Sequence, residues 1–378
     1  MSLIKNIVIA AIISAAFLKV ADVIFSFVYT KDHLVTSVTR GAERSIVLRE
    51  FNPNQIASIQ PSDQYIKGTD SLKKINYFIE IDSNGFIGNG NGNGNLLDSD
   101  PKIRIIFLGG STTESLYVQE KNRFASIVER SLRRDLSQYV LTHNAGVSGN
   151  NSMHSNFSFL AKGIPLKPDF AILMHNINDF SLLSKTESYW LAPSSRSLVA
   201  WSGNSPSELI SLLKFIKNNL FPNLYAYLKP RLFTNEILSN DEFLNYREDF
   251  SQINFQEIEQ QFQSSLTTFI QVAKSWGITP VLMTQFNRVN VDDPVFQIFF
   301  RSLIDTGISP NEFVQTYKKF NQITRTVAKE NNVFLIDLDL LIPSTPEYIF
   351  DTVHLNDNGS KYAASIISEH LIEIIDKN

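Results

Sequence analysis

The sequence predicts an α/β fold built on a parallel sheet, and two observations support this prediction. Phe170–Met174 is a continuous apolar run, and Ile103–Leu108 is apolar except for Arg104; such runs are typical of strands buried on both faces. Segments with helical periodicity, such as Lys121–Leu136 and Phe255–Trp276, alternate with these runs. Because parallel strands need crossover connections, this alternation of strand and helix favours a parallel sheet covered by helices.

The other elements continue the alternation along the chain. Tyr77–Ile81 is the first expected strand and is followed by the turn residues Asn84-Gly85. The long helix Phe255–Trp276 is stopped by Gly277. The remaining strands are expected at Val140–Thr142, Pro280–Thr284 and Val333–Ile336, and the remaining helices at Ser152–Ala161, Asn311–Glu330 and Gly359–Ile375.

Two segments interrupt the pattern. Gly88–Asn95 alternates glycine and asparagine, so it has no side chain able to build a core and is expected to be a flexible loop. It lacks the lysine and the following helix that a phosphate-binding loop needs. Residues 180–250 are rich in Ser, Asn, Leu and aromatic residues and contain four prolines. We expect an insertion of short helices and loops there, over the carboxyl edge of the sheet.

The N-terminus carries an apolar segment that favours a membrane anchor. As one helix, Ile7–Tyr29 is about 34 Å long at 1.5 Å per residue, enough to cross a bilayer. Lys19 and Asp22 interrupt it, but at this spacing they can pair on one helical face. A cleaved signal peptide with Ser14-Ala15-Ala16 as its small-residue site, or a buried or interfacial soluble helix, are the alternatives.

The sequence therefore divides into three parts. Residues 1–30 form the transmembrane anchor or uncleaved signal, 31–100 a linker and N-terminal extension, and 101–378 the main domain with its insertion. The charges leave the orientation of the anchor open, because Lys5 argues for a cytoplasmic N-terminus whereas Lys31, Arg40, Arg44 and Arg49 argue against it.

Composition excludes several classes of function. The net charge of −4 and the lack of a dense basic stripe give no electrostatic basis for binding nucleic acid. The chain has no cysteine, which rules out disulfides, thiolate metal sites and a cysteine nucleophile.

Ser111 is the first candidate for chemistry. It follows a buried strand and the pair Gly109-Gly110, which permits a tight turn and close approach of a substrate. The free N–H groups at the start of the following helix could stabilise a carbonyl oxygen as it becomes an oxyanion. The alternative is purely structural, since Ser111-Thr112-Thr113-Glu114 also fits a capping box.

Asp351 and His354 supply the groups that a serine nucleophile needs. A serine hydroxyl requires a base such as imidazole at neutral pH, and a carboxylate three residues earlier can hold that ring in the useful tautomer. The structural alternative is a loop histidine beside a capping aspartate.

Two more polar motifs follow strands of the predicted sheet. Asn144–Asn150 follows the second strand of the main domain, and Asn176-Ile177-Asn178-Asp179 follows the third. Because ligand sites in parallel sheets lie at the carboxyl ends of strands, all four motifs could converge. Gly149 would offer a backbone N–H and Asn178 an amide, although a turn and a helix cap would explain them equally well.

In this order the four motifs resemble the four blocks of the SGNH/GDSL hydrolase superfamily. Gly109–Thr112 looks like the first block, with Gly110 where many members have aspartate, and Asn144–Gly149 resembles the second. Asn176–Asp179 resembles the third, with Asn176 in place of a glycine, and Asp351–His354 matches the last. The resemblance covers roughly residues 103–180 and 255–375.

The resemblance implies specific roles for these residues. Ser111 would be the nucleophile, His354 the base and Asp351 its orienter. The oxyanion donors would be the N–H groups of Ser111 and Gly149 and the side chain of Asn178. It also implies a three-layer α/β/α sandwich around a five-stranded parallel sheet, the flavodoxin-like SGNH fold, and a reaction that needs no metal or organic cofactor.

Other side chains have weaker assignments. Substrate could contact Tyr189, Trp190 and Arg196, as a wall for a sugar or an anion, or Gln285 at the end of the fourth strand. Insertion core and a surface salt bridge are the alternatives for the first three. His175 suits a hydrogen-bonded supporting role, and a metal site built from His143 and His154 is disfavoured.

Taken together, these observations predict a membrane-anchored serine esterase with its catalytic domain on the extracytoplasmic side, periplasmic or extracellular. Its substrate would be an acylated small molecule or polysaccharide, and a carbohydrate O-acetyl ester is the first choice. An O-acetyltransferase, a lipase or lysophospholipase, and a non-catalytic scaffold in surface-polymer assembly are the alternatives.

Overall fold

The computed structural model describes residues 44–88, 101–191, 197–201, 254–301 and 309–377. Those from Ile46 to Ala200 and from Asn254 to Lys377 belong to one compact unit, which contains everything discussed below. The short strands β1 (Arg44–Ile46) and β7 (Val199–Trp201) lie at the limits of this unit in the sequence.

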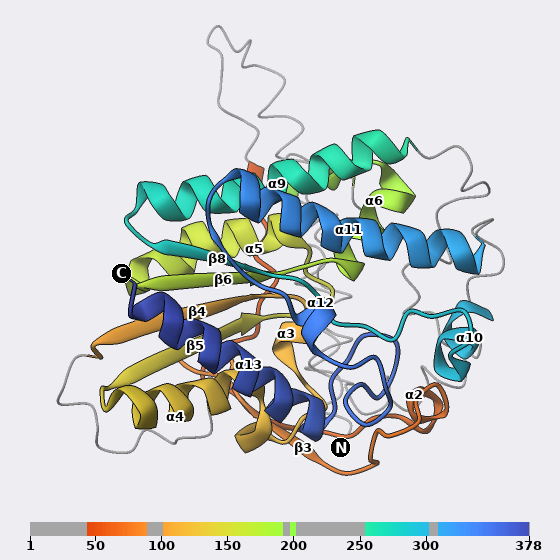
Figure 1. Cartoon of the computed structure of the whole chain (residues 1–378), viewed down its shortest axis with the longest axis horizontal. Coiled ribbons are helices and arrows are strands. Elements are labelled where there is room, and N and C mark those ends of the chain that lie inside the picture. Colours follow the sequence, from red (N-terminus) through yellow and green to blue (C-terminus); the bar gives the residue numbers. More distant parts are fainter. Residues whose placement is uncertain (1–43, 89–100, 192–196, 202–253, 302–308, 378) are drawn as a thin grey trace, which may run out of the picture. The chain divides into compact units, whose positions relative to one another are not determined.

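A five-stranded parallel sheet forms the centre of the unit (Figure 1). In spatial order its strands are β5 (Val140–Gly146), β4 (Ile103–Gly109), β6 (Phe170–Met174), β8 (Thr279–Met283) and β9 (Phe334–Ile336). Gly109 of β4 pairs with Gly146 on one side and Met174 on the other, so these three strands end level with one another. The order corresponds to 2-1-3-4-5 in chain order, as the flavodoxin-like expectation requires.

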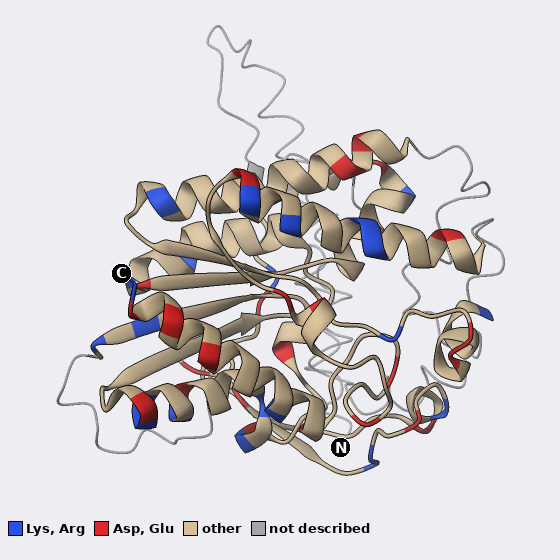
Figure 2. Cartoon of the chain, viewed as in Figure 1, with Lys and Arg blue, Asp and Glu red and all other residues tan. Residues whose placement is uncertain are grey.

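Alternate residues of the strands face two separate hydrophobic cores. Ile106 and Leu108 pack with α5 (Ser152–Ser158), α6 (Ile177–Thr186), α9 (Phe255–Ser275) and α11 (Pro310–Glu330) on one face. Ile105 and Phe107 pack with α4 (Phe124–Leu136) and α13 (Asp357–Ile375) on the other. This burial on both faces is why β4 and β6 are predominantly apolar in sequence. Figure 2 shows that the sheet strands carry few charged residues.

The remaining helical elements are short. They are α2 (Asp63–Lys67), α3 (Ser111–Glu114), η1 (Glu120–Asn122), η2 (Phe159–Gly163), η3 (Ile164–Leu166), η4 (Tyr189–Leu191), α10 (Pro294–Arg301) and α12 (Leu338–Leu341).

Most predicted bounds agree with the structure, with three differences. The helix predicted at Ser152–Ala161 ends at Ser158, because residues 159–163 form a π-helical turn. Strand β5 continues to Gly146, four residues beyond the predicted end, because its polar residues pair with β4 rather than forming a loop. Helix α4 begins at Phe124 instead of Lys121, since residues 120–122 form a separate 3-10 turn.

Residues 46–88 are more than a connecting linker. They contain the antiparallel strands β2 (Ile56–Ile59) and β3 (Tyr77–Glu80), with α2 between them. They belong to the same compact unit as the sheet. The linker and N-terminal extension predicted at 31–100 therefore include a folded portion, which we call the N-terminal strap and define as Ile46–Gly88.

Several predictions lie wholly or partly outside the described residues. The apolar segment Ile7–Tyr29 and most of the insertion at 180–250 are among them. Among the helices that the structure describes, none has the length and apolar character needed to cross a bilayer.

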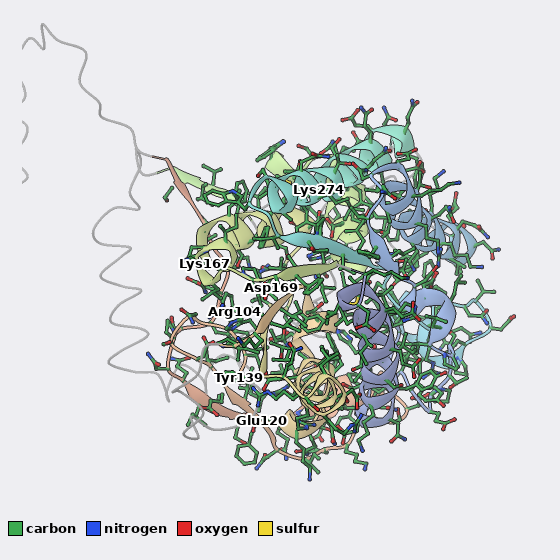
Figure 3. The ribbon with its side chains drawn as sticks, turned by 60° about the vertical axis from the view of Figure 1, so that its left-hand side comes forward. Arg104, Glu120, Tyr139, Lys167, Asp169 and Lys274 are labelled. Atoms are coloured by element: carbon green, nitrogen blue, oxygen red, sulfur yellow. The ribbon has the colours of Figure 1, made fainter. Side chains whose placement is uncertain are left out.

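The two ends of the sheet differ in the residues they carry. Arg104, Lys167 and Asp169 lie at the amino ends of the strands (Figure 3). There the Asp169 carboxylate accepts a hydrogen bond from the Arg104 backbone N–H at 2.7 Å. The four motifs singled out in the sequence belong to the opposite end.

Candidate active site

The four motifs converge at the carboxyl end of the sheet. Helix α3 follows β4, the loop Val147–Asn151 follows β5, and α6 begins three residues after β6. The strand order reverses between β4 and β6, and a crevice at such a switch point is the usual ligand site of an open parallel sheet. The loop Asp351–His354, which precedes α13, completes the group.

Ser111 is the first residue of α3, and its hydroxyl faces the last motif. Its Oγ lies 2.8 Å from Nε2 of His354, within hydrogen-bond distance. A Cβ at Gly109 would overlap Oγ1 of Thr113, so the turn into α3 requires glycine there. The capping-box alternative is not what the structure shows, because Gly110 is the N-cap residue and Glu114 accepts a hydrogen bond from Ser148 instead.

Asp351 holds His354 through both of its carboxylate oxygens. Oδ2 lies 2.7 Å from Nδ1 of the imidazole. Oδ1 accepts the backbone N–H groups of Val353 and His354 at 2.8 and 2.7 Å. The acid and the imidazole are therefore fixed relative to each other within one tight turn.

The charges in this turn make the imidazole more basic. Burial raises the pKa of the Asp351 carboxyl, but His354 and the backbone N–H groups outweigh this, and the pKa is lowered. Burial lowers the pKa of the His354 imidazole, but Asp351 and, more weakly, Glu114 outweigh this, and the pKa is raised above its ordinary value of 6.5. His354 is therefore well suited to accept a proton.

Three groups near Ser111 can donate to a developing negative charge. The N–H of Ser111 opens α3, where helix N–H groups have no partner within the helix. Gly149 has a φ of +76° within a turn that is closed by a hydrogen bond from the Asn150 N–H. The N–H of Gly149 takes no part in that hydrogen bond. Asn178 donates one amide N–H to the Asn150 carbonyl at 2.7 Å and has a second to offer.

The structure brings together Ser111, Gly149, Asn178, Asp351 and His354, but it does not present Tyr189 for contact with a substrate. Tyr189 is only 3% exposed, and its hydroxyl donates to Oδ1 of Asp179 at 2.5 Å. Its ring therefore has no exposed face for a sugar. Tyr189 fits the alternative interpretation, in which it is a core residue of the insertion. Trp190 is 63% exposed, and Arg196 lies outside the described residues.

Gln285 likewise does not line an open crevice, because its side chain is buried. Its amide N–H donates to Oγ1 of Thr112 at 2.8 Å. Its carbonyl oxygen accepts the Ile177 N–H at 3.0 Å and the Tyr317 hydroxyl at 2.8 Å. Gln285 thus ties the start of α3 to the start of α6, and so supports the positions of Ser111 and Asn178.

The three other histidines singled out in the sequence are engaged elsewhere. His175 lies 2.7 Å from the Ser155 hydroxyl, and its complete burial lowers its pKa to about 3. His154 caps α5 through Asn151, and the His143 ring packs against Phe86. Within the described ranges, no three or more His, Cys, Asp or Glu residues are grouped so that they could hold a metal ion.

Comparison with known protein families identifies the family to which the chain belongs. The family model described as the GDSL-like lipase/acylhydrolase family matches residues 107–362, which is more than half of the sequence. The chain belongs to the GDSL-like lipase/acylhydrolase family. It is accordingly a hydrolase that acts on esters. No curated protein matches the sequence.

Solved structures of this family resemble this GDSL-like hydrolase at low identity. A lipase/acylhydrolase from Enterococcus faecalis is 14% identical, with 71% of this chain and 95% of that chain covered and a TM-score of 0.41. A GDSL-like lipase from Bacteroides thetaiotaomicron is 14% identical, covering 72% and 88%, with a TM-score of 0.38. An acetyl xylan esterase is 17% identical, covering 71% and 98%, with a TM-score of 0.39.

The two departures of this GDSL-like hydrolase from the family blocks have structural explanations. Asn176 has a φ of −165°, outside the left-handed region that favours glycine, and its side-chain amide donates to the Tyr317 carbonyl at 3.0 Å, a contact that a glycine could not make. Gly110, where many members have aspartate, leaves the space that Asn178 occupies. A Cβ at Gly110 would overlap Nδ2 of Asn178.

Gly110→Ala is therefore expected to lower kcat by about tenfold or more, because the Asn178 amide would have to leave its position. Gly68→Ala is a matched control, since Gly68 has an ordinary φ of −89° and a Cβ there would meet no atom closer than 3.5 Å. Steady-state kinetics of both variants would test this. Equal kcat values for the two variants would show that Asn178 is not displaced.

Two residues at the site of this GDSL-like hydrolase have no functional assignment from the sequence. Glu114 matches only a capping pattern, and no pattern in the polar segment around Tyr65 sets that residue apart. Glu114 is buried at the end of α3, where it accepts the Ser148 hydroxyl. Burial raises its pKa to about 7, although Ser148, His354 and Arg123 oppose the shift.

Glu114→Gln is expected to stabilise the protein above neutral pH. The folded state holds the Glu114 proton up to about pH 7, whereas the ordinary value is 4.5, so the free energy of unfolding of the parent falls as pH rises between these values. Glutamine does not titrate, and its advantage should grow over this window to on the order of 3 kcal/mol. Thermal unfolding of both proteins from pH 4.5 to 8.5 would measure it.

The same substitution should also change the pH dependence of activity. Because the Glu114 charge raises the pKa of His354, its removal should move the acidic limb of kcat/KM to lower pH. An unchanged limb together with an unchanged stability difference across the pH range would contradict the assignment of a titrating Glu114.

Proposed function

We propose that this GDSL-like hydrolase is a serine esterase that works through an acyl-enzyme on Ser111. The observation that carries the proposal is the continuous hydrogen-bonded chain of three side chains. Ser111 Oγ lies 2.8 Å from Nε2 of His354, and Nδ1 of His354 lies 2.7 Å from Asp351. This arrangement of nucleophile, base and orienting acid suits acyl transfer.

In the first half of the reaction, Ser111 Oγ attacks the ester carbonyl carbon while His354 Nε2 takes the hydroxyl proton. The carbonyl oxygen becomes an oxyanion that meets the N–H groups of Ser111 and Gly149 and the amide of Asn178. The C–O bond to the alcohol then breaks, and His354 returns the proton to the leaving oxygen. The acyl group remains on Ser111.

In the second half, water replaces the alcohol. His354 takes a proton from water as its oxygen attacks the acyl carbon, and the same donors hold the second oxyanion. The bond to Ser111 Oγ then breaks and releases the carboxylic acid, while His354 gives its proton to Oγ and so restores the hydroxyl. Asp351 stays ionised and stabilises the imidazolium in both halves, which its lowered pKa supports.

For the substrate we propose an acetyl ester, carried on a cell-surface polysaccharide. This extends the proposal beyond the reaction itself. It is supported by the predicted anchor at Ile7–Tyr29, which would hold the domain at the extracytoplasmic face of a membrane where such polymers lie.

The experiment that tests the function combines active-site labelling with a series of esters. The full chain would be treated with a fluorophosphonate, and mass spectrometry would locate the adduct, which is expected on Ser111. Hydrolysis of p-nitrophenyl acetate, butyrate and octanoate would be compared, with the acetate expected to react fastest.

Other results would contradict specific parts of the proposal. Fastest turnover of octanoate would indicate a lipase. Product formation only with a sugar hydroxyl as acceptor would indicate an O-acetyltransferase. Absence of both labelling and turnover in the folded protein would indicate a non-catalytic scaffold.

A further inference from the structure

The N-terminal strap reaches the candidate active site although it lies outside the residues that define the family. The family model begins at residue 107, whereas Tyr65 belongs to α2 of the strap. The Tyr65 hydroxyl donates a hydrogen bond to Oδ2 of Asp351 at 3.0 Å. This is the same oxygen that lies 2.7 Å from Nδ1 of His354. The chain of hydrogen-bonded side chains therefore has a fourth member.

Aromatic packing holds the Tyr65 ring in this position. Its centroid lies 5.4 Å from that of Tyr117 and 6.4 Å from that of Phe350, with which it makes an edge contact. Phe350 in turn stacks on the His354 imidazole, with ring centroids 5.7 Å apart and planes only 12° from parallel. Tyr65 and His354 are thus packed on a common neighbour as well as bonded to a common carboxylate.

The strap is attached beside the Asp351–His354 turn by contacts that do not involve Tyr65. Asp70 pairs with the buried guanidinium of Arg288 at 2.7 Å, and the Asp70 N–H donates to the Phe350 carbonyl at 3.2 Å. The Arg288 N–H donates to the Thr352 carbonyl at 2.7 Å. Loss of the Tyr65 hydroxyl alone should therefore leave the strap in place.

The Tyr65 phenol is protonated, so it acts as a hydrogen-bond donor and not as an anion. Burial and the nearby Asp351 charge raise the pKa of Tyr65 well above its ordinary value, so the hydroxyl keeps its proton. A neutral donor withdraws charge from the carboxylate oxygen and restrains its rotation. Asp351 of the same loop and Glu114 of α3 are the ionisable groups that act directly on His354.

We propose that Tyr65 is a positioning residue for Asp351 and His354, so that the N-terminal strap is part of the catalytic apparatus. This inference rests on the proposed function, because it assigns Tyr65 a role in the same site. Tyr65 acts through Asp351: it fixes the carboxylate that orients the imidazole, and it moderates the attraction of that carboxylate for the imidazolium.

Tyr65→Phe should therefore have two effects in the full chain. We expect kcat for p-nitrophenyl acetate to fall about tenfold with KM nearly unchanged, as for loss of a hydrogen bond to a charged group. Without the donor, Asp351 attracts the imidazolium more strongly. The pKa of His354 should rise, and the acidic limb of kcat/KM should move to higher pH.

Tyr77→Phe provides a matched control. Tyr77 is buried in the same aromatic cluster, 5.6 Å from Tyr117, but its hydroxyl donates to the Lys73 carbonyl at 3.1 Å and does not contact the site. A merely structural role of Tyr65 would give both variants the same loss of thermal stability and leave the pH profile of each unmoved.

A second measurement does not depend on turnover. Titration of His354 by NMR in the Ser111→Ala background, with and without Tyr65→Phe, should give a higher pKa when the phenol is absent. An equal pKa in both proteins, with equal kcat and pH limb for Tyr65→Phe and Tyr77→Phe, would overturn the inference. Lack of turnover in the parent would instead count against the proposed function, while the titration would still test Tyr65.

Discussion

Ser111→Ala is expected to lower kcat for p-nitrophenyl acetate by roughly four to six orders of magnitude, because it removes the atom that forms the acyl-enzyme. His354→Ala should cause a loss of similar size, since the hydroxyl then has no base 2.8 Å away. The two residues act as a unit, so the double variant should be little worse than either single one. Steady-state kinetics of the three variants would measure this.

Ser368→Ala is a suitable control for this series. It removes a buried hydroxyl from α13, within the described core but away from the site. Its kcat should equal that of the parent. Substantial turnover that survives in both Ser111→Ala and His354→Ala would show that the chemistry takes place elsewhere in the chain.

Asn178→Ala is expected to give the next largest effect, a loss of roughly 10² to 10³ in kcat, the usual result of removing one oxyanion donor. The amide donates to the Asn150 carbonyl in the resting site, so its position is already fixed before substrate binds. KM should change much less than kcat, because the contact with the oxygen strengthens only as negative charge develops on it.

Asn156→Ala separates this effect from general destabilisation. The Asn156 amide is also buried and donates to the Ser265 carbonyl at 3.0 Å, but it lies on α5 away from Ser111. This variant should lower the melting temperature and leave kcat unchanged. A rise in KM without a fall in kcat for Asn178→Ala would show that Asn178 binds substrate and does not stabilise the oxyanion.

The central sheet can be predicted because its physical signal is local. Strands buried on both faces need long apolar runs; β6 is unbroken, and β4 is interrupted only by the half-buried Arg104 near its amino end. The sequence predicts too short a β5 because the carboxyl end of this strand carries His143 and Asn144, which look like loop residues. Asn144 is buried there because its amide donates to the Thr113 carbonyl, a partner that only the folded sheet supplies.

The residues of the candidate site also fall into those that the sequence predicts and those that it does not. Ser111, Asp351 and His354 lie in short motifs that the sequence shows directly, and the three-residue spacing of Asp351 and His354 places both in one turn. Gln285 and Tyr189 are of residue types that suit contact with substrate, yet the direction of their side chains depends on packing against distant helices. Tyr65 gives no signal at all, since its partner Asp351 lies 286 residues away in the sequence.

The separation of Ser111 from His354 also has a consequence for the time at which activity arises. The two residues are 243 positions apart, and β5, β6, β8 and β9 all lie between them in the chain. A growing polypeptide therefore contains its nucleophile long before its base, which stands in the loop directly before α13, the last helix. A chain that ends before His354 carries the nucleophile without its base, and we expect it to be inert.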